Sequence, residues 1–426
     1  MARLADSGAL RKHADTLPCF WGQQGRRRWL RIAIVSAYFD ESLDYFETTA
    51  AHWLARHNDV HVITSPFRSQ TLTDANHNDL QAFPEGVNKS GNITVHRLPV
   101  ALRQGQRVIS QHVATTLRGL SPDLTIQIVP TQFFSLPATR YSRKTGTPVV
   151  VISGENRQQG PQVGLKLLLK KAYHQTVARY ILRRTTTHAK RVVSTTPETA
   201  KFVKALSPRS DPKVIPLPFR SERYFPSESI RNVWRARLGI PDDGCAAAFI
   251  GRVVQNKRLE DILHAWDSAS GDDENNYLVI SGLGADPYSH HVRSLAQASR
   301  NADRIRLVDF VPKDDVNGLL NAVDISIWPA VSVGIQQAMA TGCLVLIPAN
   351  SPGSFLLNGQ AQTLGLLYND NSDGDPEGTS LASAVMRGKT LIDPGLRRTR
   401  ADSASTLYSD SAIVPRLLPR HSRSDA

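Results

Sequence analysis

The sequence predicts an α/β protein built from two doubly wound, Rossmann-like domains that face a central cleft. Short β-branched and apolar runs, typical of buried strands, alternate with stretches of helical spacing. The same alternation returns in the second half, after a cluster of prolines between residues 208 and 226. A chain of 426 residues has room for two or three domains of ordinary size.

The N-terminal half begins with a polar, arginine-rich leader, residues 1–29, which is expected to be disordered. Residues 30–212 are expected to form the first domain, with a helix at 46–56. The apolar runs predict strands at 31–36, 60–64, 93–98, 124–129, 148–153 and 191–195. Because strands and helices alternate, the sheet is expected to be parallel and covered on both faces.

The second domain is expected at 213–395, since prolines fix φ, lack an amide donor and suit a linker. The pattern predicts strands at 247–251, 277–281, 304–309, 325–328 and 344–348, and helices at 259–266, 381–391 and 396–408. The C-terminal segment, 396–426, is expected to be a helix that crosses back to the first domain and ends in a frayed tail.

The composition favours a cytoplasmic protein with anionic partners. The formal net charge is +13, which suits phosphates, acidic lipid headgroups or nucleic acid. The three cysteines, Cys19, Cys245 and Cys343, are scattered, which argues against a disulfide framework or a structural zinc site. No run of about 18 to 20 apolar residues is present, and no signal peptide precedes the first strand, so membrane spanning and secretion are not expected.

The loop after the first strand of the second domain is a candidate phosphate site. Gly251, Arg252 and Lys257 lie between a predicted strand and a predicted helix, at the carboxyl edge of a parallel sheet. A guanidinium, an ammonium and free helix amides all favour oxyanions there. A solvated cationic loop is the alternative explanation.

A second strand-to-helix loop carries Gly282 and Gly284. The glycines give the backbone room to approach a flat or anionic ligand, but the third glycine of a dinucleotide-binding fingerprint is missing. A tight turn without a ligand is the alternative.

Residues 324–348 contain a third candidate. The amides of Ser332, Val333 and Gly334 open a predicted helix and could add donors to the same phosphates. Ser332 could equally cap that helix.

Taken in order, these segments resemble retaining glycosyltransferases of the GT-B fold, specifically glycosyltransferase family 4. The resemblance runs from about residue 31 to 408 and is densest from 213 to 348. It rests on Val214-Ile215-Pro216, Ile250-Gly251-Arg252 with Lys257, residues 278–284, residues 308–312 and the Ala338-Met339 segment.

The resemblance implies an enzyme that moves a hexose-type sugar from a nucleoside-diphosphate sugar to a glycan or lipid-linked acceptor with retention, in cell-surface polysaccharide or glycoconjugate biosynthesis. Arg252 and Lys257 would hold the diphosphate and stabilise the leaving group, with no obligatory metal or other cofactor. The paired glutamates of the family fall at Pro329 and Gln337 in an ungapped reading. Gln337 can still hydrogen-bond ribose hydroxyls, whereas Pro329 cannot hold a sugar.

The resemblance also points to residues of the first domain. Tyr38, Asp40 and Tyr45 follow the opening strand, where the family often has a paired-glycine loop, and they could line the acceptor side; exposed loop residues are the alternative. Glu155 follows the strand at 148–153, where family members often place a histidine or acid near the reacting sugar, and is a catalytic candidate.

A basic segment marks the same domain. Residues 156–191 contain nine lysines and arginines and no Asp or Glu, with apolar residues at roughly helical spacing. The helix predicted at 163–184 could lie on an anionic membrane surface, for instance the inner face of the plasma membrane. A solvated helix packed on the sheet is the alternative.

Three other functions stay open at this point. The replaced glutamates suit a non-catalytic nucleotide-sugar-binding partner subunit of another transferase. A GT-B epimerase is a second possibility. Nucleic-acid binding has only the net charge and the basic helix in its favour, without a recognised motif, so no nucleic-acid partner is expected.

Overall fold

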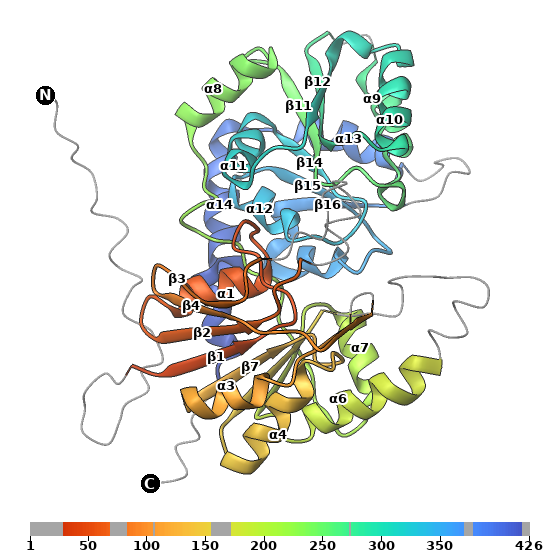
Figure 1. The fold of residues 1–426 in the computed structure, drawn as a ribbon. Coiled ribbons are helices and arrows are strands. Elements are labelled where there is room, and N and C mark those ends of the chain that lie inside the picture. The colour runs from red at the N-terminus through yellow and green to blue at the C-terminus, as the bar shows by residue number, and fades with distance from the viewer. Residues whose placement is uncertain are drawn as a thin grey trace, which may run out of the picture.

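A computed structural model of the chain describes residues 29–68, 83–104, 107–154, 172–271, 274–369 and 378–419. It confirms the predicted fold class: two lobes, each with a mainly parallel sheet between helices (Figure 1). The leader 1–28 lies outside the described residues.

The first lobe contains a sheet of eight strands in the order β10-β9-β8-β7-β1-β2-β4-β3. Every neighbouring pair is parallel except β3 with β4. A separate hairpin joins β5 to β6. The strands are β1 Arg31–Val35, β2 Asp59–Thr64, β3 Gly86–Ser90, β4 Ile93–Arg97, β5 Leu102–Gln104, β6 Arg107–Ile109, β7 Leu124–Ile128, β8 Val149–Ser153, β9 Arg191–Ser194 and β10 Lys213–Val214.

The second lobe contains six parallel strands in the order β13-β12-β11-β14-β15-β16. The strands are β11 Cys245–Ile250, β12 Asn276–Leu283, β13 Ile305–Asp309, β14 Ile325–Ile327, β15 Leu344–Pro348 and β16 Gly365–Tyr368.

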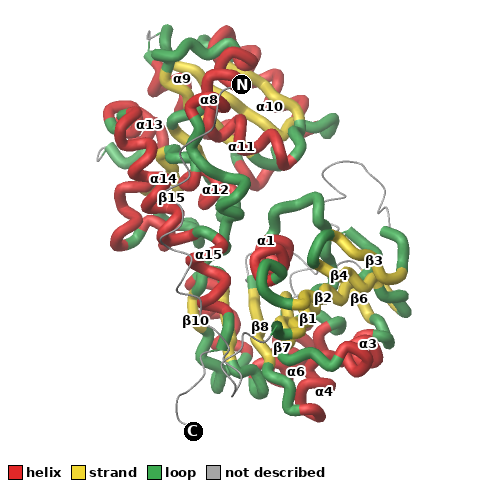
Figure 2. Tube along the Cα trace, turned by 90° about the vertical axis from the view of Figure 1, so that its left-hand side faces the viewer, coloured by secondary structure: helices red, strands yellow, loops and turns green. Residues whose placement is uncertain are grey.

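Helices cover both faces of each sheet (Figures 1 and 2). Those of the first lobe are α1 Phe46–Leu54, α3 Val113–Leu120, α4 Ser135–Thr145, the π-helix η1 His174–Ala178, α6 Arg179–Thr186 and α7 Pro197–Leu206. Those of the second lobe and C-terminal segment are α8 Glu228–Leu238, α9 Leu259–Ser270, α10 Pro287–Ala298, α11 Lys313–Ala322, α12 Gly334–Ala340, α13 Leu381–Thr390, α14 Pro394–Tyr408 and α15 Asp410–Ile413. Short 3₁₀ turns are η2 Gln255–Lys257, η3 Ala302–Arg304, η4 Ser354–Leu357, η5 Gly359–Leu364 and η6 Val414–Leu417.

Alternate residues of each central strand enter different cores. In β1, Ile32 and Ile34 pack on one face of the sheet, while Ala33 and Val35 pack on the other. Strand β11 does the same with its alanines and Phe249. Burial on both faces explains why these strands read as continuous apolar runs.

Four observed elements were not predicted as strands. Strand β3 is exposed and polar, so it has no apolar pattern, and the hairpin strands β5 and β6 have three residues each. Strand β16 completes the edge of the second sheet with only four residues. Such short or edge strands form because a neighbouring strand is already in place.

The predicted boundary at 212/213 lies a few residues too early. Strand β10 still pairs with β9, and Ile215 packs in the core of the first lobe. The chain crosses between the lobes after Ile215, and α8 begins at Glu228.

The C-terminal segment crosses in the opposite direction beside this first crossing. Tyr408 packs in the second-lobe core, and Ile413 and Val414 pack in the first-lobe core. Between them, Phe219 forms a parallel bridge with Ser409: its amide donates to the Tyr408 carbonyl at 3.1 Å, and its carbonyl accepts from Asp410 at 2.8 Å. Two chain crossings therefore join the lobes.

Candidate functional site

The loop after β11 places the two predicted cations together. Arg252 follows the end of the strand, and Lys257 ends the 3₁₀ turn before α9 begins at Leu259. Both side chains are partly buried. Burial and the positive charge of Arg252 lower the pKa of Lys257 to about 8. Because like charges repel, these two cations favour the binding of an anion between them.

The two glycine loops lie against each other. The Gly251 amide donates to the Ser281 carbonyl at 3.1 Å, and the Val253 amide donates to the Gly282 carbonyl at 3.3 Å. Gly282 has φ +104°, and a Cβ there would lie 2.0 Å from the Gly251 oxygen. Glycine is therefore required at 282 to bring the loop that carries Arg252 close to β12.

Gly284 has a local structural role. Its amide donates to Ser289 Oγ at 3.0 Å, and this hydroxyl donates to Asp286 Oδ2 at 2.6 Å. Asp286 also caps α10 by accepting from two amides. The tight-turn alternative describes this end of the loop better than a ligand contact.

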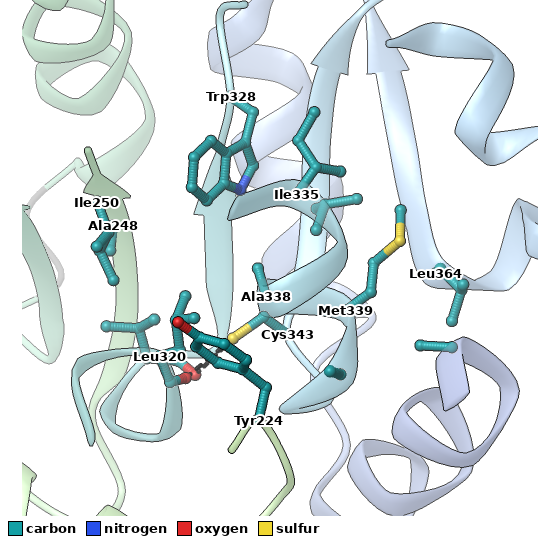
Figure 3. Packing of buried hydrophobic residues seen from close by; sticks show 14 of the residues in the cluster. Tyr224, Ala248, Ile250, Leu320, Trp328, Ile335, Ala338, Met339, Cys343 and Leu364 are labelled. Atoms are coloured by element: carbon teal, nitrogen blue, oxygen red, sulfur yellow. Dashed lines mark hydrogen bonds between the residues drawn. The ribbon is translucent and has the colours of Figure 1, made fainter. Parts of the chain in front are cut away.

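The third segment lies at the start of α12, as predicted. Packing explains the glycine at position 334. The Gly334 amide donates to Ser332 Oγ at 3.3 Å, but the N-cap residue of α12 is Val333 and not Ser332. A Cβ on Gly334 would lie 2.1 Å from the Trp328 ring, so glycine makes room for the buried indole. Figure 3 shows Trp328 beside this helix, with Ile335, Ala338 and Met339 directed into the core. Val333 precedes the helix as its N-terminal flanking residue.

Gln337 lies on α12 with 7% of its surface exposed. Pro329 lies in the partly exposed loop after β14. The segment therefore presents little polar side-chain surface where the family has paired glutamates.

Asp324, at the start of the same segment, is a buried structural hub. It forms ion pairs with Arg231 at 2.6 Å, Arg235 at 3.1 Å and Arg397 at 3.6 Å, and it accepts from the Ala246 amide at 3.0 Å. These contacts tie α8 and α14 to the sheet that carries the candidate site.

On the first lobe, Tyr45 lies within electrostatic range of Arg252. Tyr45 flanks the N-terminus of α1 and is 39% exposed. Burial raises the pKa of its hydroxyl, and the charge of Arg252 opposes that rise. The charge of Arg252 on the second lobe therefore acts on Tyr45 on the first, although the two residues lie far apart in the sequence.

The other two candidates of the first lobe, Asp40 and Tyr38, have their recorded partners within that lobe. Asp40 is buried and accepts from the amide and hydroxyl of Ser42, at 2.9 and 2.5 Å, and pairs with Arg68 at 3.1 Å. It organises its own loop. Burial raises the pKa of Tyr38, and the positive charge of Arg103, on β5, opposes the rise.

Two further groups near the start of α1 and α11 were not predicted from the sequence. Burial raises the pKa of Glu47, in the first turn of α1, to about 7, and the charge of Asp40 adds to the rise. Lys313, at the start of α11, donates to the Glu41 carbonyl at 2.6 Å and holds the loop before α1 against the second lobe. The sequence pointed to Glu47 only through its position two residues after the candidate Tyr45.

Glu155 lies outside the described residues, as does the first part of the basic segment. The described part, 172–191, forms η1 and α6, with Ile181 and Leu182 buried against the lobe. Its basic side chains lie on the opposite face.

Within the described ranges, no helix is long and apolar enough to cross a membrane. Cys343 is a free, buried thiol. The same ranges contain no group of three or more His, Cys, Asp or Glu side chains arranged to hold a metal ion.

Comparison with known proteins identifies the second lobe. A family model described as "Glycosyl transferases group 1" matches residues 230–373, which include β11 to β16 and the loop of Arg252 and Lys257. The chain is 30% identical over 165 residues to 2-deoxystreptamine N-acetyl-D-glucosaminyltransferase of Streptomyces fradiae, which covers 37% of each protein. It is 28% identical over 180 residues to D-inositol 3-phosphate glycosyltransferase of Salinispora arenicola, over 40% of this chain and 38% of that protein. The matched parts thus span less than two fifths of each relative.

Solved structures extend the likeness of fold to both lobes. Sucrose-phosphate synthase from Thermosynechococcus elongatus superposes with a TM-score of 0.66 at 17% identity, over 92% of this chain and 97% of that one. Anabaena HepE, solved in complex with UDP-glucose, superposes with a TM-score of 0.60 at 14% identity, over 91% and 98%. The chain has a GT-B-type fold, and its second lobe carries a glycosyl transferases group 1 domain.

Proposed function

We propose that this protein is a glycosyltransferase that moves a hexose-type sugar from a nucleoside-diphosphate sugar to a glycan or lipid-linked acceptor, with retention of anomeric configuration. The observation that carries the proposal is the pair of Arg252 and Lys257 at the carboxyl edge of β11, within the matched domain. The named glycosyltransferase relatives support the reaction class.

In the proposed mechanism, the two cations act on the leaving group. When the bond to the anomeric carbon breaks, negative charge grows on the diphosphate, and preorganised cations stabilise it more in the transition state than in the ground state. This role needs no obligatory metal, so none is proposed. Gly282 serves the reaction indirectly, because it lets the Arg252 loop approach the sheet.

The first lobe would bind the acceptor. Tyr45 and Tyr38 offer hydroxyls on the first lobe, and Glu155 follows β8 in the sequence. We place the enzyme in the cytoplasm, at the inner face of the plasma membrane, in the synthesis of cell-surface glycans. The basic segment and the scattered cysteines support this location.

Thermal unfolding with UDP, GDP, ADP, TDP and CMP, each with and without magnesium, tests the donor site. A ligand at about 100 times its dissociation constant stabilises a protein by about 2.7 kcal/mol. We expect one nucleoside diphosphate to raise the melting temperature of the wild type and of Arg237→Ala, a control on exposed α8, but not of Arg252→Ala. No response to any nucleotide would contradict the proposed donor site.

The second candidate is a non-catalytic nucleotide-sugar-binding subunit of another transferase. It is favoured by Pro329 and by the burial of Gln337 where carboxylates are expected. Binding of a nucleoside diphosphate without transfer or hydrolysis of the matching sugar nucleotide supports it. Turnover that is lost in Arg252→Ala eliminates it.

A further inference from the structure

A cavity of about 480 Å³ lies between α4 and α6 on the first lobe. None of the residues that line it belongs to the loops of the candidate donor site. Figure 1 shows α4 and α6 at the end of the first lobe that points away from the second lobe. The cavity is therefore a separate feature from the cleft.

Four arginines line the cavity: Arg143 from α4, and Arg179, Arg183 and Arg184 from α6. No carboxylate is among the lining residues. Across the described ranges, no ion pair joins any of these four guanidiniums to an acidic side chain. Four clustered positive charges repel one another, so the cavity is an unneutralised cationic site.

Helical geometry explains why these side chains converge. The lining residues between 176 and 188 follow spacings of three and four, which places them on one face of η1 and α6. The opposite face carries Ala178, Ile181 and Leu182, all fully buried in the lobe. Burial of the apolar face thus fixes the direction in which the arginines point.

The individual arginines have donors to spare. Arg179 Nε is buried and has no hydrogen-bond partner among the described residues. Arg183 donates from Nε to the Leu206 carbonyl at 3.0 Å. This bond orients the guanidinium and leaves its two terminal nitrogens available to a ligand. Arg184 lies over the Tyr180 ring at 5.2 Å. Two of the four guanidiniums are therefore held in place before any ligand arrives.

The remaining residues that line the cavity limit the class of ligand that it can bind. The hydroxyls of Thr176 and Thr187 already donate to backbone carbonyls, at 2.7 and 2.6 Å, so the guanidiniums, the Tyr180 hydroxyl and the His188 ring supply the donors. Planar guanidinium forks match the tetrahedral oxygens of phosphate with two parallel hydrogen bonds each. The volume suits a small ligand or a lipid headgroup rather than a polymer.

We propose that the α4–α6 cavity binds a phosphate group, as a phosphomonoester or diphosphate, carried either by a lipid headgroup or by a free phosphorylated compound. The site is distinct from the donor diphosphate site and does not depend on glycosyl transfer. The proposal assigns the expected binding of the basic segment to anionic surfaces to one specific place, the α4–α6 cavity.

The first experiment maps arginine protection residue by residue. The full chain is treated with phenylglyoxal in sodium pyrophosphate or in sodium chloride of equal ionic strength, and modification is read by peptide mass spectrometry. We expect pyrophosphate to slow modification of Arg179 and Arg183 at least fivefold, and that of exposed Arg118 on α3 less than twofold. Because each arginine is read separately, protection of Arg252 reports the donor site independently. Equal rates at Arg179 and Arg183 in the two salts overturn the proposal.

The second experiment identifies the source of the phosphate. Flotation with phosphatidylcholine vesicles, with or without 20% phosphatidic acid, compares wild type, Arg143→Gln/Arg179→Gln and the control Lys89→Gln/Arg118→Gln, which changes the net charge equally elsewhere on the lobe. A loss of fivefold or more confined to the cavity variant identifies the lipid headgroup. Protection by pyrophosphate together with equal vesicle binding of the two variants identifies a free phosphorylated compound.

Discussion

The hydroxyl of Tyr224 donates a hydrogen bond of 2.9 Å to Oδ2 of Asp44, and both side chains are almost fully buried. Tyr224 packs in the core of the second lobe, whereas Asp44 precedes α1 of the first lobe. Arg220 and Arg223 add ion pairs to Asp44 at 3.6 and 3.4 Å. This junction lies beside the two chain crossings, so it couples the position of α1 to the second lobe.

Replacing Tyr224 with Phe tests this junction. The change keeps the ring and removes one hydrogen bond to a charged group, which is worth about 1.5–3 kcal/mol. We expect the free energy of unfolding to fall by about that amount in chemical denaturation. Tyr180→Phe, at an exposed position, is the control and should be close to neutral. Equal stability of Tyr224→Phe and wild type would show that the junction is not important.

Gly282→Ala tests the close approach of the two glycine loops. The new Cβ would meet the Gly251 oxygen at 2.0 Å, so backbone must move in addition to the strain of φ +104°. We expect a loss of about 3 kcal/mol or more in the free energy of unfolding, together with weaker nucleotide binding.

Gly271→Ala is the matched control for this change. Gly271 also has positive φ, at +55°, but nothing lies within 4 Å of its Cβ position. Backbone strain alone, at the Gly271 angles of φ +55° and ψ −145°, costs about 1–3 kcal/mol. If the two variants lost the same stability, the contact with Gly251 would have no energetic role.

The depressed pKa of Lys257 predicts how donor binding depends on pH. Burial and Arg252 lower this pKa to about 8, so Lys257 is mostly protonated at pH 7 and loses its charge as the pH rises through 8. A diphosphate binds the charged form better. Its affinity should therefore hold from pH 7 to 7.5 and fall up to tenfold per pH unit above pH 8, measured by isothermal titration calorimetry. In Lys257→Arg, whose guanidinium stays charged, the curve should stay flat to pH 9.

Glu47 predicts a pH dependence of stability. Its pKa is raised to about 7 by burial and by Asp40, so the folded state binds this proton more tightly than the unfolded state does. The resulting stabilisation is complete below about pH 4.5 and is lost as the pH rises through 7. Glu47→Gln should remove this loss and raise the melting temperature at pH 8 by about 2–4 °C relative to wild type. A gain of the same size at pH 5 would contradict the assignment.

The sequence predicted most of the central strands because they are buried on both faces. β1, β8 and β15 are almost continuous runs of apolar residues, and such runs are recognisable without any partner. The strands that it missed, β3, β5, β6 and β16, depend on neighbours or are too short to show a period.

The residues of the candidate site were also predicted only in part. Arg252, Lys257 and Gly282 were predicted from loops that follow strands, because the carboxyl ends of parallel strands meet at one edge of a sheet. Asp40 and Gly284 were predicted to contact ligand, but they hydrogen-bond within their own loops. Local polar contacts of this kind compete with ligand contacts and have no signature in residue type.

The sequence by itself determined the two sheets and the cationic loop at the edge of the second, because burial patterns and strand-to-helix loops are local properties of the chain. Only the tertiary structure decided that the charge of Arg252 reaches Tyr45, that Tyr224 donates to Asp44, and that Arg143 joins the arginines of α6. Each of these relationships depends on how separate elements pack, and packing is set by apolar surfaces that lie far apart in the sequence.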